Sequence, residues 1–89
     1  MMLYLISYDL EKPNASAEDY QPLISALEGQ GATRVLWSEW ILTSTLPAKA
    51  VFDYFWQYRS SSADRLLVTQ LSAWHGTQAN LLAPMPTNF

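Results

Sequence analysis

The chain has 89 residues, the length of a single domain, of which 49% are apolar and only 15% are charged. A net charge of −3 with five dispersed basic side chains lacks the cationic surface of a dedicated nucleic-acid binder. The absence of cysteine excludes disulfides and thiolate metal sites, and the single histidine excludes a multi-histidine metal site within one protomer.

The large apolar fraction favours an oligomer, because so small a domain cannot bury all of its large side chains alone. The apolar segment at residues 1–6 is too short to span a bilayer and carries no basic leader. We therefore expect a cytoplasmic protein that does not enter the membrane.

Residues 2–9 predict a strand with two apolar faces, which is typical of a central strand. Its two alternating sets are Leu3 and Leu5 on one side and Tyr4, Ile6 and Tyr8 on the other. A turn is predicted at residues 11–14, where proline and asparagine interrupt the pattern.

A helix is predicted next, from the apolar stripe formed by Tyr20, Leu23, Ile24 and Leu27. Either Ser16 or Asp19 could cap its start. Asp19 is the better choice, because it places Pro22 in the first turn, where backbone N–H groups have no helical partner. Gly29 and Gly31 are expected to end the helix.

Two strands are predicted at residues 33–37 and 39–45, joined at Ser38 in a ribbon that includes a bulge. Pro47 is expected to open a second helix through about residue 58. Its inner stripe comprises Val51, Tyr54, Phe55 and Tyr58. Residues 65–71 predict the fourth strand, and residues 73–89 an irregular arm or a short extra strand.

This order predicts an α+β protein of the ferredoxin-like βαββαβ type at residues 1–72, followed by the arm at residues 73–89. Two helices would cover one face of a four-stranded antiparallel sheet, with the first and third strands in its middle. The other face, with aromatic and aliphatic side chains, is the expected dimer surface.

Asp9, at the exit of the first strand, is the main candidate for a functional site. It either accepts hydrogen bonds from the following turn or acts as a ligand in an active site. Glu11 could add a second oxygen if the strand continues, since alternate residues share a face; otherwise it is a solvated loop charge.

The other candidate groups each have a structural alternative. Ser7 and Ser38 could supply hydroxyls, but no histidine lies near them in sequence to activate a nucleophile. His75 could be a general acid or a surface residue, and the four tryptophans could stack on bases or pack in the core. Arg34 and Arg65 are the phosphate-contact candidates, with pairing to acids as the alternative.

Four segments together resemble the small CRISPR-associated endonuclease of spacer acquisition and its VapD-like and SinR-like relatives. The resemblance covers about residues 2–71 and depends on the order and spacing of short motifs. These motifs are Ser7-Tyr8-Asp9-Leu10, Leu27-Glu28-Gly29-Gln30-Gly31-Ala32, Arg34-Val35-Leu36-Trp37-Ser38-Glu39-Trp40 and Asp64-Arg65-Leu66-Leu67-Val68.

The resemblance implies a ferredoxin-like homodimer that, in some members, hydrolyses RNA or DNA with a divalent metal. It further implies that Asp9 meets the same residue of its dimer mate, that the pair holds Mg²⁺, and that Ser38 lies nearby. Three functions stay open. The first is a metal-dependent nuclease, and the second is a non-catalytic dimer that binds a protein partner and uses Asp9 as a turn residue. The third is a small-ligand sensor, since the fold hosts many functions.

Overall fold

The computed structural model describes residues 2–9 and 17–72 and contains the six predicted elements in the predicted order. They are β1 (Met2–Asp9), α1 (Ala17–Gly29), β2 (Thr33–Leu36), β3 (Glu39–Ser44), α2 (Ala48–Trp56) and β4 (Arg65–Leu71). The bounds predicted for the first and fourth strands are confirmed to the residue. The predicted turn at residues 11–14 and the arm at residues 73–89 lie outside the described residues.

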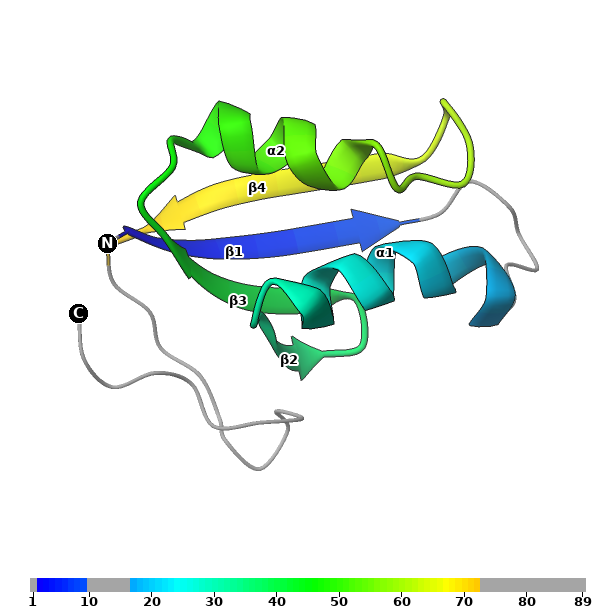
Figure 1. The fold of residues 1–89 in the computed structure, drawn as a ribbon, viewed down its shortest axis with the longest axis horizontal. Helices are drawn as coiled ribbons and strands as arrows, with labels where there is room; N and C mark the ends of the chain where they lie inside the picture. Colours follow the sequence, from blue (N-terminus) through cyan, green and yellow to red (C-terminus); the bar gives the residue numbers. More distant parts are fainter. Residues whose placement is uncertain (1, 10–16, 73–89) are drawn as a thin grey trace.

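The four strands form one antiparallel sheet in the order β2-β3-β1-β4. Both helices lie on the same face of this sheet, α1 towards β3 and α2 towards β4 (Figure 1). The first and third strands therefore occupy the middle, as predicted. This arrangement is the α+β ferredoxin-like fold.

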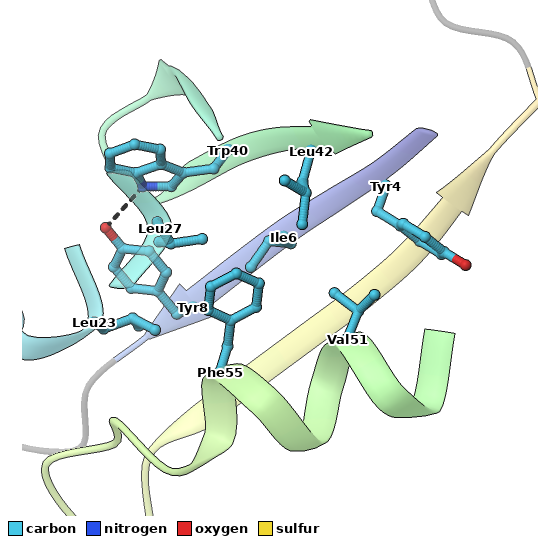
Figure 2. Packing of buried hydrophobic residues seen from close by; sticks show 9 residues of the cluster. All are labelled: Tyr4, Ile6, Tyr8, Leu23, Leu27, Trp40, Leu42, Val51 and Phe55. Atoms are coloured by element: carbon cyan, nitrogen blue, oxygen red, sulfur yellow. Dashed lines mark hydrogen bonds between the residues drawn. The ribbon is translucent and has the colours of Figure 1, made fainter. Parts of the chain in front are cut away.

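The main core fills the space between the helices and the sheet (Figure 2). From β1 it takes Tyr4, Ile6 and Tyr8, all buried, because alternate residues of a strand share a face. The remaining members are Leu23, Leu27, Trp40, Leu42, Val51 and Phe55. Complete burial of one such side chain contributes about 1.5–3 kcal/mol to folding, so this cluster is a large favourable term in the stability of the fold.

The opposite face of the sheet, hereafter the helix-free face, has no helix over it among the described residues. It is aliphatic: the members of its cluster are Leu3, Val35 and Ile41, with Leu5 and Leu71 half-buried beside them. The expectation that aromatic residues share this face is wrong for the strands, because their tyrosines and Trp40 belong to the helix-side core. Leu67, opposite Ser7 in the ladder, is 60% exposed there.

Helix α1 begins at Ala17, so the prediction that Asp19 caps it is wrong. Pro22 instead lies inside the helix, where it has no N–H to donate to the carbonyl four residues earlier. Glu18 and Asp19 occupy the first turn, where negative charge complements the helix dipole. Burial of the inner stripe, including Leu27, outweighs the missing hydrogen bond.

The predicted end of α1 is confirmed. Gly31 has a φ of 78°, and its N–H donates to the Glu28 carbonyl at 3.0 Å. The Ala32 N–H donates to the Leu27 carbonyl, also at 3.0 Å. This pair of bonds is a Schellman motif, which satisfies two carbonyls at the helix end and needs a residue that tolerates positive φ.

The ribbon of β2 and β3 contains the predicted irregularity, a register shift between Arg34 and Leu36. Helix α2 begins one residue later than predicted: Pro47 is its N-cap, and the Pro47 carbonyl accepts the Val51 N–H at 3.1 Å. It ends at Trp56, two residues before the predicted end, and buries Val51 and Phe55. Both differences involve helix ends, where local propensity changes little from one residue to the next.

Asp64 organises the connection from α2 to β4. Its carboxylate Oδ2 accepts the backbone N–H groups of Ser60 and Ser61 at 2.7 and 2.8 Å, and the residue is 7% exposed. Replacing Asp64 by Ala leaves these donors without that acceptor in a partly buried place. We expect Asp64→Ala to lower the free energy of unfolding by about 1–3 kcal/mol, measured by urea denaturation.

Asp53 provides the control for this change, because its ion pair with Lys49 is exposed. Asp53→Ala is expected to cost only about 0.5 kcal/mol. Equal losses for the two variants would show that the Asp64 carboxylate does not stabilise the connection.

Candidate functional site

Asp9 is the last residue of β1, and its side chain is exposed. Strand alternation places it on the helix-free face, because Tyr8 before it points into the helix-side core. No group within residues 2–9 and 17–72 donates a hydrogen bond to its carboxylate. Asp9 is thus accessible, and its predicted turn partners at residues 11–14 lie outside the described residues.

Sheet pairing brings three further polar side chains to the same end of the helix-free face. Arg65 lies directly opposite Asp9 on β4, and Glu39 lies opposite Ser7 on β3. The Ser7 hydroxyl donates to Glu39 Oε2 at 3.1 Å. A shallow hollow of about 220 Å³ lies here, lined in part by Ser7, Asp9, Arg65 and Leu67.

Glu39 is a candidate that sequence analysis missed. It shares the helix-free face with Asp9 and lies two positions along the ladder, on the neighbouring strand. Two residues in such diagonal positions have Cα atoms about 7–8 Å apart, so both carboxylates can approach one bound cation through water. Glu39 could not be found from the sequence, because its position beside Ser7 depends on the register of β1 with β3.

Ser38 lies beside the end of β1, as the resemblance implied. Its backbone carbonyl accepts the Tyr8 N–H at 3.1 Å, and its side chain is exposed in the turn between β2 and β3. The fold therefore brings Ser38 and Asp9 to the same end of the sheet.

Arg34 lies on the other side of the sheet from Asp9. Its guanidinium carbon is 5.6 Å from the ring centroid of Trp37 and 5.1 Å from that of Trp40. One of its Nη atoms donates to the Tyr8 hydroxyl at 3.4 Å, and this hydroxyl also accepts the Trp40 indole N–H at 3.2 Å (Figure 2). Of the two predicted phosphate contacts, only Arg65 shares a face with Asp9.

No group of three or more histidine, aspartate or glutamate side chains that could hold a metal ion occurs among the described residues. Asp9 and Glu39 supply two carboxylates per protomer, and oxygen ligands of this kind suit Mg²⁺. Within the described residues, no third carboxylate or histidine joins this pair. Glu11 and His75, which could have added ligands or a proton donor, lie outside the described residues.

Neither α1 nor α2 is long and apolar enough to cross a membrane. The ferredoxin-like fold hosts many unrelated activities, so the fold alone assigns no function. No family model matches this chain, and no solved structure matches it significantly.

Proposed function

We propose that this protein is a homodimer that hydrolyses phosphodiester bonds of RNA or DNA with a divalent cation, as the small CRISPR-associated endonucleases do. The supporting observation is Asp9, an exposed carboxylate at the end of the central strand, with no hydrogen-bond donor among the described residues. In the proposed dimer the helix-free faces of two copies approach each other, and the two Asp9 carboxylates bind one Mg²⁺.

Electrostatics explains why such a pair takes a cation. Two carboxylates about 5 Å apart repel by roughly 3 kcal/mol at an effective dielectric constant of about 20. Mg²⁺ removes this repulsion, accepts one or two carboxylates and keeps several of its waters. The bound cation would polarise a phosphoryl oxygen and lower the pKa of an attacking water.

The neighbouring side chains have roles that fit this chemistry. Arg65, opposite Asp9 in the ladder, would contact a phosphate oxygen of the substrate. Glu39 would orient water bound to the cation, held in place by the Ser7 hydroxyl. Ser38, beside the end of β1, would contribute a further hydroxyl.

Leu67 provides the test of the dimer surface. It is 60% exposed on the helix-free face, so an aspartate at this position barely affects the monomer but becomes a buried, unpaired charge in the dimer. We expect Leu67→Asp to convert the dimer to a monomer at micromolar concentration, measured by light scattering after size-exclusion chromatography.

Leu46→Asp is the matched control, because Leu46 is 51% exposed in the connection between β3 and α2, away from this face. It should leave the molar mass unchanged. A wild-type protein that is monomeric at tens of micromolar would contradict both the dimer and the shared Asp9 site.

The activity is tested by incubating purified wild-type protein with single- and double-stranded RNA and DNA in Mg²⁺, Mn²⁺ or EDTA over a range of pH. Cleavage that requires the metal and co-elutes with the dimer supports the proposal. Absence of cleavage under all of these conditions contradicts it.

A second candidate is a non-catalytic dimer that binds a protein partner. It is favoured by the scarcity of positive charge: of the basic residues in the described ranges, only Arg65 lies on the helix-free face, while Lys49 and Arg59 belong to α2 and the loop after it. This function predicts no difference in Mg²⁺ or Mn²⁺ affinity between wild type and Asp9→Asn in calorimetry. Asp9-dependent turnover would exclude it as the main role.

A further inference from the structure

Trp37 and Arg34 form an unusual surface feature at the turn between β2 and β3. Trp37 is 76% exposed, whereas Trp40, whose ring also lies near the Arg34 guanidinium, is 4% exposed. The Arg34 guanidinium carbon lies 5.6 and 5.1 Å from the two ring centroids. One aromatic ring thus anchors the cation to the core, and the other is open to solvent.

The guanidinium has unused hydrogen-bonding capacity. Of its five N–H groups, only one Nη atom has a partner within the described part of the chain, the Tyr8 hydroxyl at a long 3.4 Å. Its Nε is buried and has no partner there. Water screens the charge of a partly buried guanidinium less than that of an exposed one. A bound anion is therefore attracted more strongly and can accept the unused hydrogen bonds.

This feature lies at the same end of the sheet as Asp9. Trp37 precedes Ser38, whose carbonyl accepts the Tyr8 N–H, and Tyr8 precedes Asp9 in β1. The Tyr8 hydroxyl also donates to the Trp37 carbonyl at 3.4 Å. Trp37 and Asp9 therefore lie at the same end of the sheet, although Arg34 faces the helix side and Asp9 the helix-free face.

We propose that Trp37 and Arg34 form a nucleotide subsite for single-stranded RNA or DNA, in which a base stacks on Trp37 and a flanking phosphate binds Arg34. The further step, that the bound strand also reaches Asp9 around the end of the sheet, rests on the function proposed above. Stacking suits any base, since every base has a π-face, and it needs only one exposed ring. A planar guanidinium recognises a phosphate through two parallel hydrogen bonds.

Binding is measured apart from catalysis, by fluorescence anisotropy of short labelled oligouridylate and oligothymidylate with the Asp9→Asn protein in EDTA. Trp37→Ala, a change at an exposed side chain, is expected to weaken binding about tenfold through loss of stacking. Arg34→Gln is expected to weaken it similarly and to reduce the slope of log affinity against log salt by about one.

The chain contains a matched control. The Arg59 guanidinium carbon lies 4.8 Å from the Trp56 ring centroid, but this arginine donates to the Trp56 carbonyl and lies after α2. Arg59→Gln removes the same charge from the same kind of pair, and should leave the affinity within about twofold because phosphate contacts act locally. Equal losses for Arg34→Gln and Arg59→Gln would indicate a general charge effect and overturn the subsite.

The remaining outcomes separate this subsite from the nuclease proposal. Trp37-dependent binding without any metal-dependent cleavage by wild type supports the subsite and contradicts the nuclease. Cleavage by wild type with an unchanged KM in Trp37→Ala supports the nuclease and overturns the subsite. Displacement of the oligonucleotide by polyglutamate at equal charge concentration would also overturn it, because an anionic peptide lacks the stacking base.

Discussion

Asp9→Asn is expected to abolish metal-stimulated cleavage while leaving the protein folded and dimeric. Loss of groups that merely orient metal ligands costs about 10–100-fold, so removal of the carboxylate from both halves of the proposed shared site should cost more than about a hundredfold. The fold should be unaffected, because Asn has the same shape and the Asp9 side chain is exposed. The measurement is the initial rate of cleavage in saturating Mg²⁺, with circular dichroism to check folding.

Asp9→Asn is also expected to strengthen the association of the two subunits when the metal is removed. In EDTA, two wild-type carboxylates about 5 Å apart would repel by roughly 3 kcal/mol, and Asn removes this repulsion. Asp9→Asn should therefore dimerise more tightly than wild type in EDTA. Adding Mg²⁺ should tighten the wild-type dimer, because the cation removes the same repulsion. Sedimentation at several protein concentrations measures both effects.

Asp53→Asn is the control for the catalytic effect, since it removes one exposed carboxylate from α2, away from the helix-free face. It should retain the wild-type rate. Cleavage by Asp9→Asn at more than about a tenth of the wild-type rate would rule out a metal ligand at this position.

Phe55→Ala is expected to have the largest effect on stability. Phe55 is 1% exposed in the core between α2 and the sheet (Figure 2), and truncation leaves a cavity that a close-packed interior fills only partly. The expected loss is about 3–5 kcal/mol of unfolding free energy. Because a domain of this size has a total stability of roughly 5–10 kcal/mol, the variant should lose from about a third to all of it.

Phe52→Ala on the same helix separates burial from residue type. Phe52 is half-buried and stacks on Trp56, with ring centroids 5.6 Å apart, so its truncation should cost only about 1–2 kcal/mol. Urea denaturation at one fixed protein concentration measures both variants, since the proposed dimerisation would make the apparent stability depend on concentration. Similar losses would mean that Phe55 is not the central contact of α2.

The strands were the elements most accurately predicted from the sequence. Residues 2–9 and 65–71 are bounded by sharp changes in apolar pattern, and the structure begins and ends β1 and β4 at these residues. Gly31 also marked the end of α1 correctly, because positive φ at that position strongly favours glycine. In these cases the residues of a short segment favour one backbone conformation without help from distant parts of the chain.

The start of α1 shows where local reasoning failed. The rule that proline avoids a helix interior placed the start at Asp19, yet the helix begins at Ala17 and contains Pro22. One lost hydrogen bond was outweighed by burial of Leu23 and Leu27 against the sheet. The gain from that burial depends on the sheet, which is distant in sequence.

The sequence by itself determined the order of elements, the ferredoxin-like topology and the central place of β1, because hydrophobic period and turn residues act over a few positions. It also identified Asp9 as the one residue to test. Only the tertiary structure decided which side chains accompany Asp9: strand register placed Arg65 opposite it and Glu39 opposite Ser7, while alternation placed Arg34 on the other face. Strand register, and the face on which each side chain lies, follow from pairing between segments that are distant in sequence. A slip of one residue would move every side chain of a strand to the other face of the sheet, so no local pattern could have specified them.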